Sequence, residues 1–218
     1  MTVTVQVALY LPSDLRRPEV RSELRPRERK ALERIAAWAE EYLCHPHEQL
    51  GRSGAVCPYV QHSLNEGLFW LAVGHRGDTE EIVERVLAHR DRFLELEPIA
   101  GIDALGKTVL IVFPELTAED GPLLDRVQKL LKPEFTELGL MIGQFYEGCT
   151  EPGIWNRDFH PLQSPVPLLA IRAMVPSDFP FLVARSQFLE PYFERFAHEI
   201  PERIRRRIVD ELTHERGR

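Results

Sequence analysis

Two apolar runs decide the fold: Leu68-Phe69-Trp70-Leu71-Ala72-Val73 and Val109-Leu110-Ile111-Val112-Phe113. Short continuous apolar runs predict buried strands, and Pro114 ends the second of them. A strand that is apolar along its whole length is buried on both faces, which requires helices on both sides of the sheet. The two runs therefore predict the middle layer of an α/β protein.

Three further segments complete the predicted sheet. Residues 140–145 and 166–174 are also apolar, whereas residues 2–11 alternate, with Val3, Val5 and Val7 on one face. Such alternation is typical of a half-buried strand near a sheet edge. The sequence therefore predicts five strands.

The segments between the strands have helical periodicity. Apolar stripes predict helices over 26–43 and 79–96, and Thr117 caps another that we expect to end at Pro133. Two C-terminal helices follow. The predicted fold class is α/β (α+β): a single domain over 1–218, with a mixed five-stranded sheet covered by helices on both faces. The apolar stripes of the two C-terminal helices are Phe188, Leu189, Tyr192, Phe193 and Phe196, then Ile204, Ile208 and Leu212.

The composition restricts the classes of partner. The chain has 218 residues and a formal net charge of -7, whereas nucleic-acid-binding proteins concentrate Lys and Arg against phosphates. No apolar run approaches the roughly 20 residues that cross a bilayer, and the N-terminus lacks the features of a signal peptide. Three cysteines are too few for a disulfide framework. We expect a cytoplasmic protein that binds a small-molecule substrate, not nucleic acid or a membrane, and we allow for a homodimer.

Two long segments, 44–66 and 146–165, are predicted to be loops. Long irregular segments in a compact domain usually carry function. Each joins elements that are fixed by the sheet core, so we predict that the two loops converge on one pocket.

The first loop permits two kinds of cysteine chemistry. Cys44, His45, His47 and Cys57 supply zinc-ligand types, but their spacing departs from that of structural zinc sites. Cys57 is also a candidate nucleophile, with His47 and His62 nearby in sequence, or a buried thiol before Pro58. Phosphate-binding glycine motifs and the His-Glu-x-x-His motif are absent from the sequence.

Haem is the cofactor that these loops fit best by residue type. Haem iron takes an axial His, Cys or Tyr, and its propionates take Arg or Lys. The candidate iron ligands are His47, Cys57, Tyr146 and His160, and the candidate propionate contacts are Arg52, Arg157 and Arg172. Two of these residues have an alternative interpretation. Arg172 could face outward from its strand and pair with a surface carboxylate, and His160 could be a solvent-exposed loop residue.

Several motifs resemble an uncharacterised actinobacterial family found around specialised-metabolite gene clusters. The resemblance covers most of the chain after residue 35. No activity is known for that family, so the resemblance implies none for this chain. The matching segments are Pro46-His47, Leu50-Gly51-Arg52, Gly54, Val56-Cys57-Pro58-Tyr59, Phe113-Pro114, Val127-Gln128, Lys132-Pro133, 139–143 and 161–172.

A more distant resemblance is to the YqcI/YcgG-like proteins, some of which are haem-dependent N-oxygenases that act on amino acids. Cys57-Pro58-Tyr59, Phe113-Pro114 and Gln128 match that outline, but Tyr146 stands where that family has a His directly after the strand. The resemblance implies a haem-dependent oxidative tailoring enzyme for a small amine or amino acid. The alternative is a cofactor-free binding or accessory protein for a biosynthetic partner.

Overall fold

The structure, a computed structural model, describes residues 7–183, 185–197, 202, 203 and 206. Its sheet has four strands in the order β1-β2-β4-β3. β1 and β2 are parallel, and β4 is antiparallel to both β2 and β3, so the predicted mixed sheet is confirmed. The strands are β1 (Phe69–Val73), β2 (Thr108–Val112), β3 (Leu140–Phe145) and β4 (Leu168–Ala173).

The prediction of a fifth strand over 2–11 is wrong for the residues that the structure describes, and residues 2–6 lie outside them. Tyr10 alone pairs with the sheet, through hydrogen bonds of 2.9 and 2.8 Å with the backbone of Leu71. Pro12 has no N–H to continue such a ladder. The N–H of Leu11 instead donates to the carboxylate of Asp14, and a short 3-10 helix, Asp14–Arg16, begins there.

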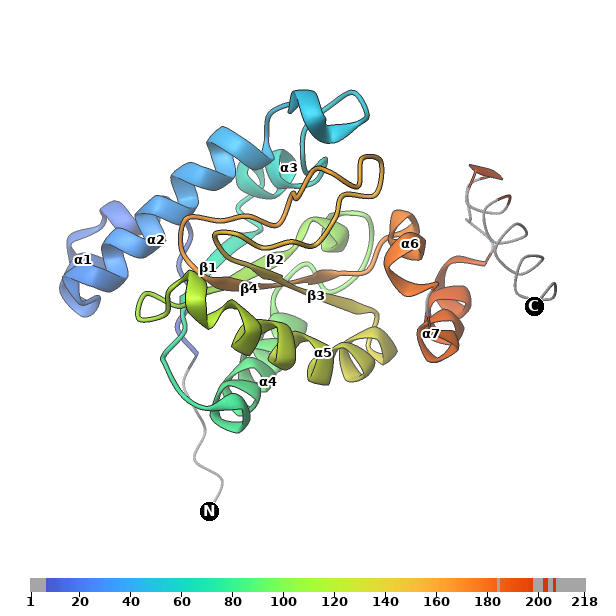
Figure 1. Cartoon of the computed structure of the whole chain (residues 1–218). Helices are drawn as coiled ribbons and strands as arrows, with labels where there is room; N and C mark the ends of the chain where they lie inside the picture. The colour runs from blue at the N-terminus through green and yellow to red at the C-terminus, as the bar shows by residue number, and fades with distance from the viewer. Residues whose placement is uncertain (1–6, 184, 198–201, 204–205, 207–218) are drawn as a thin grey trace, which may run out of the picture.

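Helices cover both faces of the sheet, as predicted. One face carries α1 (Pro18–Glu23), α2 (Pro26–Trp38) with its π-helical extension η2 (Ala39–Leu43), and α3 (Val60–Asn65). The other face carries α4 (Thr79–Glu95) and α5 (Gly121–Glu137) (Figure 1). The sheet is therefore the middle of three layers.

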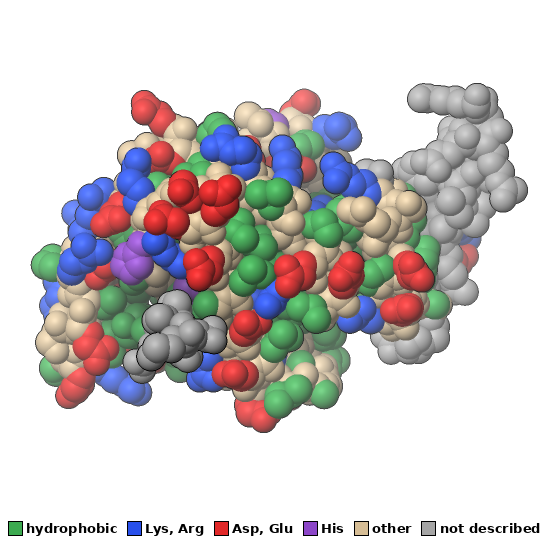
Figure 2. Space-filling model, turned by 90° about the horizontal axis from the view of Figure 1, so that it is seen from below, with side chains coloured by type: hydrophobic (Ala, Val, Ile, Leu, Met, Phe, Trp, Pro, Cys, Tyr) green, Lys and Arg blue, Asp and Glu red, His purple; other side chains and the backbone are tan. Residues whose placement is uncertain are grey.

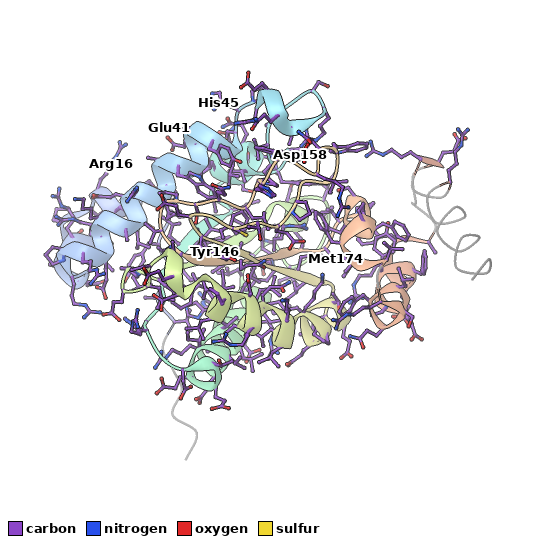
Figure 3. All side chains as sticks on the ribbon, in the orientation of Figure 1. Arg16, Glu41, His45, Tyr146, Asp158 and Met174 are labelled. Carbon is purple, nitrogen blue, oxygen red and sulfur yellow. The ribbon has the colours of Figure 1, made fainter. Side chains whose placement is uncertain are left out.

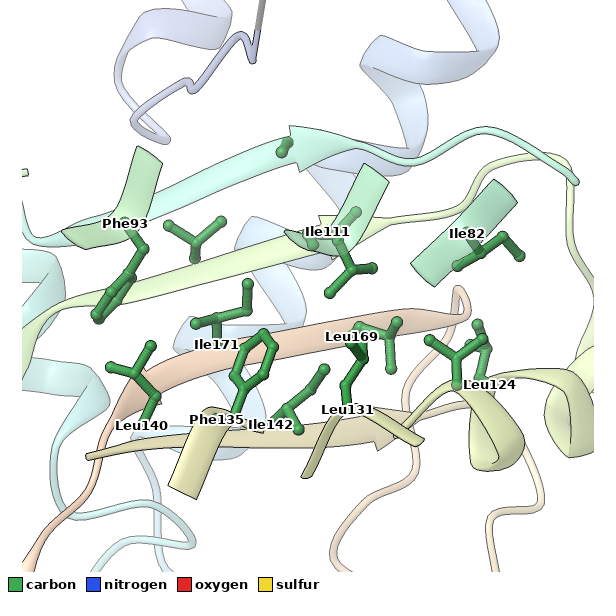
Figure 4. Packing of buried hydrophobic residues seen from close by; sticks show 14 of the residues in the cluster. Ile82, Phe93, Ile111, Leu124, Leu131, Phe135, Leu140, Ile142, Leu169 and Ile171 are labelled. Atoms are coloured by element: carbon green, nitrogen blue, oxygen red, sulfur yellow. The ribbon is translucent and has the colours of Figure 1, made fainter. Parts of the chain in front are cut away.

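A large cluster of buried hydrophobic residues fills the core between the sheet and the second helical layer (Figure 4). Ile82 and Phe93 of α4 and Phe135 of α5 are at most 1 % exposed and pack against the strands. These positions recur on one face of each helix, which is why the apolar stripes located both helices in the sequence.

Helix α5 does not end at Pro133, where we expected it to stop; it runs on to Glu137. Proline removes one helical hydrogen bond and usually kinks or ends a helix. Here Phe135 lies beyond the proline and is fully buried in the core. Packing of that last turn outweighs the local preference to stop.

Two other segments differ in detail from the sequence prediction. The predicted loop 44–66 contains a 3-10 turn, η3 (Glu48–Leu50), and the helix α3. At the C-terminus α6 (Phe179–Leu182) precedes α7 (Ser186–Phe196), which confirms the first predicted C-terminal helix. The stripe of the second, Ile204, Ile208 and Leu212, lies outside the described residues.

The face covered by α4 and α5 is charged. Figure 2 shows acidic side chains spread across it among basic and hydrophobic ones. In the part of the chain that the structure describes, no helix combines the length and apolar character needed to cross a bilayer.

Candidate functional site

The two long loops lie against each other, so the predicted contact is confirmed, whereas the pocket that we expect them to share stays a prediction. The rings of His47 and Phe159 stack with centroids 4.6 Å apart, and the side-chain amide of Asn156 donates to the carbonyl of Gln49 at 2.8 Å. In Figure 3 the labelled His45 and Asp158 mark the two loops above the sheet. The loops are therefore one surface, although they are separated by about half of the chain.

Gly51 allows this close approach. Its φ of 77° is in the left-handed region, and a Cβ at this position would lie 3.0 Å from the backbone of Trp155. A side chain would have to push the second loop away, so glycine is required here by both conformation and space.

The arginines proposed for haem propionates mostly have other partners. Arg52 donates to the carbonyls of Ser53, Ala55 and Val56 in its own loop, at 2.9, 2.8 and 3.2 Å. Arg172 forms two hydrogen bonds with the buried carboxylate of Asp178, at 2.7 and 2.5 Å. Arg52 therefore stabilises the first loop, and Arg172 stabilises the segment that follows β4.

Arg157 differs from the other two arginines. It is exposed in the second loop and makes no hydrogen bond or ion pair with the described residues. Of the three arginines it is the one whose charge is available to a ligand.

Tyr146 does not join the histidines of the loops. Its hydroxyl donates to Asp125 at 3.1 Å, and its ring packs where a side chain on Gly121 would stand, at the start of α5 (Figure 3). Burial, followed by the nearby Cys149 and Asp125, raises the pKa of the phenol far above its ordinary value. Tyr146 is therefore a protonated hydrogen-bond donor at neutral pH.

The two candidate histidines have different surroundings. The Nδ1 atom of His47 accepts from the N–H of Gln49 at 3.2 Å, which makes His47 the cap of η3. The Nδ1 atom of His160 is buried and has no hydrogen-bond partner among the described residues. A buried polar atom without a partner is rare and costs free energy, so His160 is the residue of this loop pair with unused bonding capacity.

A cavity of about 230 Å³ lies elsewhere, at the carboxyl ends of the parallel strands β1 and β2. A second cavity of about 140 Å³ is its neighbour and shares Glu28, Val73 and Gly74 with it, and we call the two cavities together the cleft. Ligands of open α/β sheets bind outside the carboxyl ends of the strands. The polar side chains of the larger cavity are Tyr10, Glu23, Glu28, His75, Arg85 and His89.

His89 is a buried titratable group of this cavity. Its Nδ1–H donates to the carbonyl of Arg85 at 2.7 Å, one helical turn earlier in α4. Burial lowers the pKa of the imidazole, and the nearby His75 lowers it further. A neutral imidazole whose Nδ1 is committed as a donor keeps a lone pair on Nε2. That nitrogen can accept a proton or a hydrogen bond.

The opposite wall of the cleft is acidic. Burial raises the pKa of Tyr10, and the carboxylates of Glu23 and Glu28 raise it further. Glu28 itself stays ionised, because hydrogen bonds from Arg25 outweigh its burial and lower its pKa. One wall therefore holds Glu23 and the ion pair of Glu28 with Arg25, and the other holds Arg85 and His89.

The comparisons with known proteins give the family and no function. A family model described as a domain of unknown function (DUF6875) matches residues 32–207. The chain belongs to the DUF6875 family. No curated protein and no solved structure matches it. The matched region of this DUF6875 chain includes both loops, the sheet and His89, whereas Tyr10, Glu23 and Glu28 precede it.

The cleft of the DUF6875 chain was not predicted from the sequence, although two features of the sequence point to it. His75 comes directly after the strand end at Val73 and Gly74, at the edge where ligands bind to such sheets. Arg85 and His89 are four residues apart in a helix, so they share a face. No single motif joins these residues, because they come from separate elements that meet only after folding.

The buried His89 makes stability pH-dependent. In the unfolded chain a histidine titrates near its ordinary pKa of 6.5, whereas the folded pKa is lower. As pH falls below 6.5 the unfolded state binds more protons, so the free energy of unfolding should fall with pH. His89→Gln keeps a donor for the Arg85 carbonyl but cannot titrate. We expect this variant to lose less stability than wild type between pH about 7.5 and about 5.5, measured by urea unfolding. Equal losses would contradict a depressed pKa at His89.

Proposed function

We propose that the DUF6875 chain is an enzyme that binds a small amino acid or amine in the cleft and uses His89 as a general base. One observation carries the proposal: a buried, neutral imidazole with a fixed tautomer lines a cavity beside fixed charges. Perturbed titratable groups in a concave site are typical of catalytic sites.

The charges support an amino acid over a simple amine. Glu23 and Glu28 on one wall can bind an ammonium group, and Arg85 on the other can bind a carboxylate. Nη1 of Arg85 donates to the carbonyls of His75 and Arg76, at 3.1 and 3.2 Å, which orients the guanidinium. Its Nη2 lies 4.0 Å from the carboxylate of Glu81, an ion pair without a hydrogen bond, so a ligand carboxylate would compete with Glu81 for this side of the guanidinium.

The size of the cavity also favours a small ligand. Drug-sized ligands occupy pockets of roughly 300–1,000 Å³, and the larger cavity measures about 230 Å³. Several walls of this cavity are apolar, including Val86, Ile111 and Phe113. They suit the side chain of a modest aliphatic or aromatic amino acid.

A thermal-shift experiment tests the proposal. The probes are the proteinogenic amino acids and their decarboxylated amines. A ligand at about 100 times its Kd stabilises a protein by about 2.7 kcal/mol, which should raise the Tm of a chain this long by roughly 5–10 °C. We expect at least one amino acid to act and its amine to act less, because the amine lacks the carboxylate for Arg85. No shift with any member of the panel would reject the proposed ligand class.

A second candidate function is a haem-dependent oxidative tailoring enzyme, with the haem between the two loops. The observation that favours it is the buried Nδ1 atom of His160, which has no partner among the described residues. His160 would be the iron ligand, and the exposed Arg157 would contact a propionate. The bound group would supply redox chemistry, while His47 and Phe159 would form an aromatic wall.

Haem titration tests this second candidate. If His160 is the ligand, wild type should develop a Soret band that His160→Ala shifts or abolishes. Tyr146→Phe should leave the band unchanged, because Tyr146 is bonded to Asp125. A wild-type protein that gains no Soret band would exclude the haem function, and loss of the band in Tyr146→Phe alone would assign the ligand to Tyr146.

A further inference from the structure

Cys44 and Cys57 lie at the base of the first loop, one on each side of its neck. Pro46 and Ala55 form an isolated antiparallel bridge at this neck. The bridge does not continue as a ladder, because Cys44 has the helical backbone conformation that ends η2. The N–H of Cys57 donates to the carbonyl of Leu43, the neighbour of Cys44, at 2.9 Å, which holds the two segments together at this level.

This placement suits a disulfide. The hydrogen bond from Cys57 to the carbonyl of Leu43 places the backbone of Cys57 beside that of Cys44, and disulfides join residues whose Cα atoms are about 4.4–6.8 Å apart. Cys44 and Cys57 both pack against the cluster of buried residues that contains Leu43 and Val60.

The two thiols are free and half-buried, whereas Cys149, the remaining cysteine, is buried. Burial raises the pKa of Cys44, and the negative charge of a Cys57 thiolate raises it further. Both thiols are therefore open enough for a small oxidant to reach.

We propose that Cys44 and Cys57 are a redox pair that forms a reversible disulfide when a peroxide oxidises either thiol. One thiolate attacks a peroxide oxygen and breaks the O–O bond, which gives a sulfenic acid and, from hydrogen peroxide, one water. The second thiolate then attacks that sulfur. The S–S bond forms, the S–OH bond breaks, and a second water leaves with the remaining proton.

The disulfide would close the first loop at its neck. The closed segment contains His47 and Gly51, whose contacts with Phe159 and Trp155 join the two loops. Oxidation would therefore rigidify the surface formed by both loops. The proposed disulfide lies outside the cleft, and the proposal does not depend on the proposed function.

Mass spectrometry of the full chain tests the pair. After treatment with hydrogen peroxide, we expect the mass to fall by two hydrogen atoms. Alkylation should then add one alkyl group in place of the three that the reduced chain takes up, and digestion should give one linked peptide that joins Cys44 to Cys57. A thiol reductant should reverse both changes. Cys149→Ser is the matched control and should form the same link.

The single variants Cys44→Ser and Cys57→Ser should form no link and should trap a sulfenic acid as a dimedone adduct on the cysteine that is left. Wild type should give little of this adduct, because the second thiol resolves it. Dimedone adducts on both cysteines of wild type without a link would overturn the proposal. A link through Cys149, or between two chains, would overturn it equally.

Discussion

Asp178→Ala is expected to lower the free energy of unfolding by about 3–5 kcal/mol, because it leaves the charge of Arg172 without its partner. The Asp178 side chain is 2 % exposed and accepts two hydrogen bonds from Arg172. It also accepts from the N–H of Val175 at 2.8 Å, at the start of the turn Pro176–Asp178. The variant therefore removes an ion pair and a turn contact together.

The measurement is urea unfolding followed by circular dichroism. Asp158→Ala removes an exposed carboxylate from the second loop and should change stability by no more than about 0.5 kcal/mol. The double variant Arg172→Met/Asp178→Leu should lose less than Asp178→Ala, since apolar residues can replace a buried pair without leaving a charge. A loss below about 1 kcal/mol for Asp178→Ala would show that water solvates Arg172 adequately without its partner.

His89→Gln is expected to reduce turnover by about 100- to 10,000-fold, the usual contribution of a general base. Glutamine can keep the hydrogen bond to the Arg85 carbonyl, but its amide cannot accept a proton at neutral pH. Binding of the amino acid should change little, because the charged walls of the cleft are intact. The assay follows consumption of the amino acid that gives the largest thermal shift.

His62→Gln is the matched control. Its imidazole is 49 % exposed, lies outside the cleft and pairs with Asp103 at 4.0 Å, so turnover should match that of wild type. The wild-type rate should also fall as pH decreases through the pKa of His89 in the folded protein, which burial places below the ordinary value of 6.5. Unchanged turnover in His89→Gln would remove His89 from the mechanism and leave the cleft as a binding site.

Much of the fold followed from periodicity. The continuous apolar runs located β1 to β4, because a strand buried on both faces has no polar alternation to obscure it. The helical stripes located α2, α4 and α5, because the buried residues of each helix recur on one face. The wrong predictions concern local features. The predicted N-terminal strand is reduced to a single bridge at Tyr10. Helix α5 continues past Pro133, because burial of Phe135 outweighs the tendency of proline to end a helix.

The site was less predictable than the fold. Anchoring of both loops by the sheet correctly predicted that they meet, as the stack of His47 on Phe159 shows. The alternative that Arg172 pairs with a surface carboxylate was right about a carboxylate and wrong about its exposure, because Asp178 is buried. The bond of Tyr146 to Asp125 was not predicted, because the partner of a tyrosine depends on tertiary contacts. For the same reason the sequence gives no direct sign that His89 lies in a cleft beside Glu28.

The most direct test of the central claim is a crystal structure of the protein in complex with the amino acid that gives the largest thermal shift. We predict that the ligand lies at the carboxyl ends of β1 and β2, with its ammonium near Glu23 and Glu28 and its carboxylate near Arg85. His89 should be within hydrogen-bond distance of the ligand. A ligand bound instead between loops 44–66 and 146–165, in contact with His160, would contradict the account.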